Sequence, residues 1–119
     1  KDSDYLLEAK HIIQHLDNQL GAANGGWYEG DYAYDCRRQN PHMHLFEAFM
    51  ALYEASGDAS FLSRASEMFG LFQAHFFDDK QQVLFEFFDD DWRLLQNKKG
   101  QQVEPGHLLE WVWLVDWYS

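Results

Sequence analysis

Two stretches of the sequence carry apolar side chains at the spacing of an α-helix. In residues 4–20 and in residues 59–77, apolar positions recur at i, i+3, i+4 and i+7, with polar residues between them. This pattern predicts two amphipathic helices, each with one buried face and one exposed face. The apolar positions are Tyr5, Leu6, Ala9, Ile12, Ile13, Leu16 and Leu20 in the first helix, and Phe61, Leu62, Ala65, Met68, Phe69, Phe72 and Phe76 in the second.

Two other segments are apolar almost all the way round. Residues 45–53 read LFEAFMALY, and residues 108–118 read LLEWVWLVDWY. A helix that is apolar on all sides is predicted to be buried on all sides. The four segments therefore predict an all-α fold in which outer, half-exposed helices alternate with inner, buried ones along the chain.

The connections between these helices alternate as well. Residues 21–40 and 78–104 are long and polar, with short β-like pieces at GWYEGDYAY and QVLFEFFDDDW. The link SGDAS is short: Gly57 is predicted to end one helix, and Asp58 or Ser60 to cap the next. Short links and long loops in alternation predict helical hairpins whose long loops carry function at one end.

The order of features repeats once, over residues 4–56 and 59–118. NPHMHLFEA in the first half aligns with EPGHLLEW in the second, which places His44 on His107. Two hairpins cannot cover both inner helices by themselves, so more hairpins of the same kind are expected outside this stretch. We therefore expect residues 1–119 to form one internal fragment of a toroid or solenoid in a longer protein.

The composition narrows the kind of partner. The 119 residues are 46% hydrophobic and 18% aromatic, which is typical of a globular chain with a core. A net charge of −11 disfavours nucleic acids and anionic membrane surfaces as partners, and no apolar run is long enough to span a bilayer. Cys36 is the single cysteine, which excludes an intrachain disulfide and suits a reducing, cytoplasmic compartment. A small molecule with little charge is the expected ligand.

Both inner helices are expected to begin in the same way. Asn40 is predicted to cap the first, with Pro41 at the first helical position, and Glu104 and Pro105 repeat the pattern. The positive end of a helix disfavours an imidazolium ion, whereas a nearby carboxylate favours it, and the sequence does not decide between them. Each helix start carries a histidine with a glutamate three residues later on the same face: His44 with Glu47, and His107 with Glu110.

His42 has a plainer role in this interpretation. It lies two residues before His44, so the two side chains do not share a helix face. We interpret His42 as structural or loop-facing. A metal site is not predicted, because neither a cysteine cluster nor an HExxH pattern accompanies the two histidines.

Two neighbouring arginines stand out in this acidic chain. Arg37 and Arg38 are predicted either to hold a substrate oxygen or to pair with Asp31 or Asp35, and pairing is the favoured interpretation for Arg37. Most of the tryptophans are predicted to be core residues, with one or two at the edge of a pocket. Flat aromatic faces beside carboxylates and imidazoles suit a carbohydrate ligand.

These motifs, in this order, resemble the N-acylglucosamine 2-epimerase family, which includes mannose isomerases and cellobiose 2-epimerase. The resemblance rests on RQNPHMHLFEAFMALYEASGD and VEPGHLLEWVWL, with GGWYEG, SFLSRASEMFGLF and LFEFFDDDW in the family's order, and it covers nearly the whole chain. It implies an (α/α)6 barrel, of which this chain would supply two hairpins. It also implies a sugar epimerase or isomerase that moves a proton at C2 through an enediolate-like intermediate.

The resemblance further implies roles for individual residues. His107, in the EPGH motif, would be the general acid/base; a second such histidine lies much later in family sequences, and nothing in this chain matches it. No cofactor or metal ion is implied. The identity of the sugar, its phosphorylation, nucleotide dependence and homodimer formation stay open. Without the second histidine and most of the pocket wall, the isolated chain is expected to be inactive. The residues implied to bind the sugar are His44, Glu47, Glu110, Arg38 and Trp111.

Two other interpretations are kept beside this one. A glycoside hydrolase on the same toroid would place two carboxylates across the scissile bond, drawn from Glu47, Glu110 and Asp91, although histidine-centred motifs fit that chemistry less well. A non-catalytic helical-repeat module would keep its function after His44 and His107 are removed. Proton exchange at C2 of a sugar separates both from an epimerase or isomerase.

Overall fold

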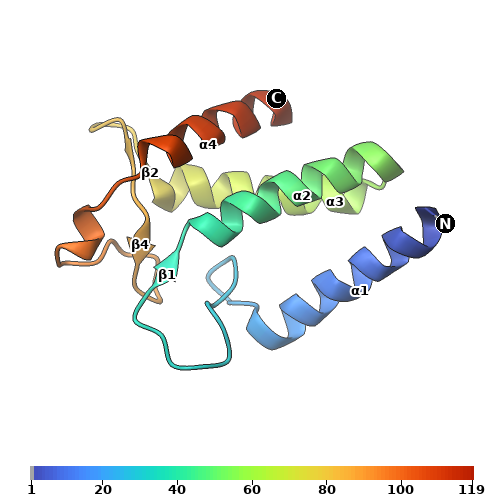
Figure 1. Ribbon diagram of the computed structural model, residues 1–119, viewed down its shortest axis with the longest axis horizontal. Helices are drawn as coiled ribbons and strands as arrows, with labels where there is room; N and C mark the ends of the chain where they lie inside the picture. The colour runs from blue at the N-terminus through green and yellow to red at the C-terminus, as the bar shows by residue number, and fades with distance from the viewer. Residues whose placement is uncertain (1) are drawn as a thin grey trace.

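The computed structural model describes residues 2–119, with side chains from Asp4 onward. Within this range the chain is mainly helical, and its strands are only two residues long (Figure 1). A π-helical turn, η1, extends α3, and a 3-10 turn, η2, precedes α4. The helices are α1 (Asp2–Leu20), α2 (Asn40–Ser56), α3 (Ala59–Leu71) and α4 (Pro105–Tyr118), with η1 at Phe72–Phe76 and η2 at Lys99–Gln101.

The two predicted helices and the short link are confirmed, but the predicted buried face of α1 is only half-buried, and its Tyr5 and Ile12 are 75% and 55% exposed. The link bends back sharply because Gly57 adopts φ +70°, a left-handed conformation that glycine takes without strain and that ends α2. Asp58 then caps α3, and its carboxylate accepts a hydrogen bond from the Ser60 backbone N–H at 2.9 Å. The segment 59–77 is less regular than predicted, because the hydrogen-bond pattern changes from α to π at Phe72.

The predicted start of α2 is wrong by one residue. Gln39, and not Asn40, holds the cap position, and its carbonyl accepts hydrogen bonds from the His42 and Met43 backbone N–H groups. Gln39 already has helical backbone angles, and its side chain does not cap the helix. α4 begins at Pro105 after Glu104, as predicted, although the Glu104 side chain makes no capping hydrogen bond.

The two inner helices are not buried on all sides by the described residues. On α4, Trp111 and Leu114 are buried, whereas Leu109, Val112 and Trp113 leave 70%, 59% and 58% of their surface exposed. This difference arises because α4 packs against α2 and the β3 region on one side only. The exposed face agrees with the expectation that two hairpins cannot cover both inner helices.

Two short antiparallel pairings tie the long loops together. β2 (Phe77–Asp78) pairs with β3 (Val83–Leu84) as a hairpin, and β1 (Arg37–Arg38) pairs with β4 (Phe87–Phe88) across some fifty residues of sequence. The second predicted β-like piece therefore holds β3 and β4. The first contributes only an isolated bridge at Trp27 among the described residues, and the strand forms further on, at β1.

The core lies between α2, α3 and the start of α4. Trp111 is fully buried and stacks between Phe46 of α2, at 5.2 Å between ring centroids, and Phe72 of η1, at 4.5 Å. Close aromatic packing of this kind fixes α4 against α2 and η1. The position of the first turn of α4 is what the site depends on.

Candidate functional site

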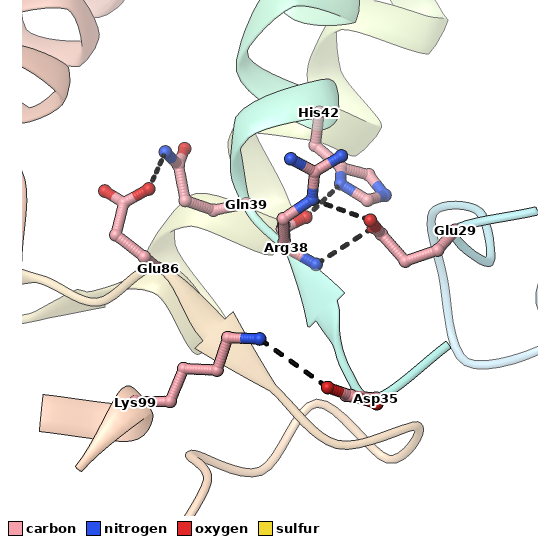
Figure 2. A network of polar contacts seen from close by, with 7 residues as sticks. All are labelled: Glu29, Asp35, Arg38, Gln39, His42, Glu86 and Lys99. Carbon is pink, nitrogen blue, oxygen red and sulfur yellow. Dashed lines mark hydrogen bonds and ion pairs between the residues drawn. The ribbon is translucent and has the colours of Figure 1, made fainter. Parts of the chain in front are cut away.

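The polar residues of interest gather where β1 leads into α2 and passes beside β4. Figure 2 shows Arg38, Gln39 and Glu86 side by side at this junction, with Glu29 reaching in from the preceding loop. The ladder between β1 and β4 is continued by a hydrogen bond from the Gln39 backbone N–H to the Glu86 carbonyl at 3.1 Å. Neighbouring residues on adjacent strands present side chains to the same face, which explains why Gln39 and Glu86 meet.

Arg37 is a structural residue of this junction. Its side chain is fully buried, and its guanidinium donates to Asn24 Oδ1 at 2.9 Å and to backbone carbonyl oxygens of Gly25, Trp27 and Asp90 at 2.8–3.2 Å. The guanidinium carbon also lies 3.8 Å from the centre of the Trp92 ring. The predicted pairing of Arg37 with Asp31 or Asp35 is wrong. The guanidinium donates instead to main-chain oxygens and to one side-chain amide oxygen.

Arg38 points the other way, toward solvent (Figure 2). Glu29 holds it with both carboxylate oxygens: Oε1 accepts from Arg38 Nε at 2.7 Å, and Oε2 accepts from the Arg38 backbone N–H at 3.1 Å. The Glu29 side chain is 7% exposed, whereas that of Arg38 is 46% exposed. The two terminal nitrogens of Arg38 therefore face outward on a side chain that is fixed at its base.

His42 is locked inside the molecule. Its Nδ1 donates to the Arg38 carbonyl at 3.0 Å, and its Nε2 accepts from the Trp27 backbone N–H at 3.1 Å. Burial lowers the pKa of His42 to about 4, and the hydrogen bond to Arg38, which favours the charged ring, offsets only part of this effect. Gly26 packs so closely that a Cβ there would lie 2.6 Å from His42 Nε2. The interpretation of His42 as structural is confirmed.

His107 lies in the first turn of α4 and faces the buried carboxylate of Glu86. Its Nδ1 is 2.9 Å from Glu86 Oε1, and Gln39 Nε2 is 2.9 Å from the same oxygen. The Trp111 indole N–H donates to Gln39 Oε1 at 2.6 Å. The His107 side chain is 28% exposed, and within residues 2–119 its Nε2 has no hydrogen-bond partner. The ring therefore offers one nitrogen to the protein and one to a ligand.

Glu86 is the site residue that was not predicted to be one. Glu110, three residues further along the same helix, was predicted to bind the sugar, with orienting the ring as the other role open to it. It is exposed and has no hydrogen bond or ion pair to His107 in the described structure. One signal was available. In LFEFF, Glu86 lies on the same strand face as Leu84 and Phe88, both buried, and a charged residue on an apolar strand face needs a buried partner.

Of the other predicted ligand residues, His44 and Glu47 lie outside this hydrogen-bonded group, whereas Trp111 belongs to it. His44 is exposed and Glu47 half-buried on α2, and neither is hydrogen-bonded to His107. Trp111 has no exposed surface, so it reaches the site through Gln39 rather than through a ligand. Two clefts of about 400 and 440 Å³ lie next to Trp92 and next to Trp27, and neither is lined by His107.

The described residues contain neither a membrane-spanning helix nor a cluster of metal ligands. From residue 2 onward, no helix is long and apolar enough to cross a membrane. No group of three or more histidine, cysteine, aspartate or glutamate side chains in that range is arranged to hold a metal ion. The chemistry available at His107 is proton transfer by a ring whose second nitrogen is held by a carboxylate.

Fold and site together define a class of protein: a run of helical hairpins with a histidine–carboxylate pair at the start of an inner helix. The chain belongs to the N-acylglucosamine 2-epimerase family, whose sequence model matches residues 2–118. The fold is part of an (α/α)6 barrel, as predicted. It superimposes on cellobiose 2-epimerase from Bacillus thermoamylovorans B4167 with a TM-score of 0.80 at 20% identity, over 98% of this chain and 33% of that one.

Two curated relatives are similar in sequence. Mannose-6-phosphate isomerase of Rhizobium meliloti (strain 1021) is 46% identical over 78 residues, which are 64% of this chain and 20% of the relative. D-mannose isomerase of Thermobifida fusca is 28% identical over 125 residues, which cover 92% of this chain and 30% of the relative. The chain thus spans about a fifth to a third of the length of the proteins it matches.

Proposed function

We propose that the protein interconverts sugars by moving a proton at C2 of an aldose or N-acylhexosamine, with His107 as general acid/base. One observation carries the proposal: the His107 ring is held through Nδ1 by a buried carboxylate, while Nε2 is left without a protein partner in residues 2–119. A general base needs this combination, since it must be held in place and still have a free lone pair.

In the proposed step, Nε2 of His107 takes the proton from C2 of the open-chain sugar. The C2–H bond breaks, its electron pair forms the C1–C2 double bond of an enediolate, and the carbonyl oxygen takes the negative charge. Return of a proton to C2 from the opposite face inverts C2 and requires a second acid/base group. Return of the proton to C1, with transfer of the proton on the C2 hydroxyl to O1, converts an aldose to a ketose. The His107 imidazolium is the proton donor when the proton returns on its own side.

The remaining predicted residues are proposed to hold the sugar. His44 and Glu47 lie on one side of α2, and Glu110 lies on α4 one turn beyond His107. Arg38 presents its outer nitrogens to a hydroxyl or a more strongly charged oxygen. Trp111 was predicted to bind the sugar, but we now propose that it positions Gln39, since its ring has no exposed surface.

The names of the relatives support a sugar as substrate but not a particular one. They include an isomerase of mannose 6-phosphate, an isomerase of free D-mannose and a 2-epimerase of cellobiose. These three substrates share an open-chain aldehyde next to a C2 hydroxyl, which is the group that the proposed step acts on.

The test is proton exchange in D2O with the full-length protein, using mannose, mannose 6-phosphate, N-acetylglucosamine and cellobiose. We expect deuterium at C2 with at least one of them, and loss of that exchange in His107→Ala. His11→Ala is the matched control, because His11 is an exposed histidine on α1. Exchange that survives in His107→Ala would refute the proposal, and cleavage of cellobiose without exchange at C2 would favour a hydrolase.

A further inference from the structure

We propose that Glu86 is a positioning residue that sets the tautomer of His107 and stabilises its protonated form, and that Gln39 and Trp111 fix Glu86 in turn. The inference rests on the proposed function for its catalytic part only. The tautomer can be measured without any assumption about the reaction.

The hydrogen-bond directions can be assigned from Trp111 outward, because an indole nitrogen only donates. The Trp111 N–H donates to the Gln39 side chain at 2.6 Å, so the oxygen of that amide must face the indole. The amide nitrogen must then face Glu86, where it donates to Oε1 at 2.9 Å. A single donor in the core thus fixes the orientation of Gln39.

The same logic fixes the proton on His107. Glu86 Oε1 accepts from Gln39 and also lies 2.9 Å from His107 Nδ1. Without a proton on Nδ1, two lone pairs would face each other at that distance, so Nδ1 carries the proton and donates to Glu86. Gln39 Nε2, at 3.3 Å from Nδ1, is also a donor and does not change this assignment. The lone pair of the neutral ring is therefore on Nε2, the nitrogen that has no partner in the described part of the chain.

Glu86 also has an incomplete set of hydrogen-bond donors around its carboxylate. The residue is 4% exposed, and its second oxygen, Oε2, is buried with no hydrogen-bond partner in the part of the chain that the structure describes. A buried carboxylate that is only partly compensated attracts an additional positive charge strongly. When His107 takes the C2 proton, an imidazolium forms next to Glu86 Oε1. Glu86 therefore interacts more favourably with the His107 ring after proton transfer than before it. This difference lowers the barrier to proton transfer.

The kinetic test uses Glu86→Gln in the full-length protein. The variant keeps the shape of the side chain but removes the charge, and its amide nitrogen can turn toward His107 and favour the wrong tautomer. We expect kcat to fall about 100-fold with KM within about threefold, because Glu86 does not touch the sugar. The acid limb of the kcat–pH profile should move to lower pH, because the neighbouring negative charge is lost.

Glu104→Gln is the matched control. Glu104 precedes α4, is exposed and makes no side-chain capping hydrogen bond, so the substitution removes one negative charge at the same helix start without touching the network. We expect its kcat, KM and pH profile to equal those of the wild type. A second variant, Trp111→Phe, removes the indole donor and frees the Gln39 amide to rotate, and we expect kcat to fall about fivefold to tenfold in this variant.

A spectroscopic measurement decides the matter if Glu86→Gln does not fold. In the full-length wild type, 15N NMR of labelled histidine should show the His107 proton on Nδ1, with that proton shifted far downfield. The proton on Nε2, or Glu86→Gln with wild-type kcat and acid limb, would overturn the inference. If exchange survives in His107→Ala, the proposed function fails, and the NMR result still tests the role of Glu86 separately.

Discussion

His42 and His107 occupy the same place in two different helices and have opposite properties. Each is the third residue after a cap, and each backbone N–H donates to the carbonyl of that cap residue at 2.9 Å, Gln39 in α2 and Glu104 in α4. By helix position, the counterpart of His107 is therefore His42, although the sequence motifs align His44 with it. His42 is 1% exposed, whereas the His107 side chain is 28% exposed.

The partners of the rings account for the difference. His42 Nδ1 donates to a neutral backbone carbonyl, and its Nε2 is occupied by a backbone N–H. His107 Nδ1 faces a buried carboxylate, and its Nε2 has no hydrogen-bond partner among the described residues. A backbone carbonyl compensates an imidazolium weakly, and a carboxylate compensates it strongly. A place in the first helical turn is thus compatible with a buried structural histidine that is neutral at pH 7 and with the proton carrier proposed at His107.

The adjacent arginines repeat the contrast within one strand. Successive side chains of β1 point to opposite sides of the strand. The Arg37 side chain is buried among the loops, where main-chain oxygens and the Trp92 ring surround it, and the Arg38 side chain points outward. In both pairs, one residue holds the junction together and its counterpart is presented to solvent. If the structural and ligand-facing roles are as separate as the structure indicates, removing a buried member should affect stability, and removing an exposed member should affect catalysis.

The largest expected effect is on catalysis alone, in His107→Gln. Removing the base should lower kcat by about three orders of magnitude, which lies within the usual contribution of a general acid/base. The free energy of unfolding should change by only about 1 kcal/mol, because the glutamine amide can still donate to Glu86. Initial rates and urea unfolding of the full-length protein measure the two quantities. A loss of stability that accounts for the loss of rate would contradict the assignment.

The opposite result is expected for His42→Ala. The substitution leaves the Trp27 N–H and the Arg38 carbonyl without partners and opens a cavity among aromatic rings, so the free energy of unfolding should fall by about 3 to 4 kcal/mol. The rate per folded molecule should change little. Urea unfolding followed by tryptophan fluorescence measures the loss, with the exposed His15→Ala expected within about 0.5 kcal/mol of wild type.

These contrasts could be predicted only in part from the sequence. Periodicity is a local property, so it located all four helices, and turn chemistry located the Gly57–Asp58 link. The alignment of motifs singled out His107, and the two-residue spacing to His44 led to the interpretation of His42 as structural. Each of these signals is read within one continuous segment or by comparing two such segments.

What the sequence did not show depends on the pairing of β1 with β4. That pairing joins segments about fifty residues apart, and it alone brings Gln39 beside Glu86. The two-residue strands carry too little pattern to predict their partner or register. The partners of Arg37 are mostly main-chain carbonyls, which have no sequence signature, so a nearby aspartate was the only choice that the sequence offered.

A third prediction uses pH to separate the two histidines. The pKa of His42 is lowered to about 4 by burial, below its usual value of 6.5. The unfolded chain therefore binds one more proton than the folded chain between these values, so the stabilisation is complete above pH 6.5 and is lost as pH falls toward 4. The loss amounts to about 2 to 3 kcal/mol at pH 4.

The measurement is a difference, because many acidic groups also titrate in this range. His42→Gln should be less stable than wild type at pH 7, and this deficit should shrink by about 2 to 3 kcal/mol by pH 4. Urea unfolding of both proteins at half-unit pH steps gives the curve. A deficit that stays constant with pH would show that His42 becomes protonated in the folded state as readily as in the unfolded one.

The smallest expected effect concerns Arg38, the exposed member of the arginine pair. Arg38→Ala should raise KM about tenfold and leave kcat nearly unchanged, because the outer nitrogens are proposed to bind the sugar before and after proton transfer alike. Arg38→Lys keeps a charge but loses the Nε–H that Glu29 holds, so its KM should lie between the two. The exposed Arg93→Ala is the matched control for the loss of one positive charge. If Arg38→Ala instead lowered kcat and left KM unchanged, Arg38 would stabilise the charge that develops in the transition state. Arg38 would then take part in proton transfer together with His107, rather than only holding the sugar.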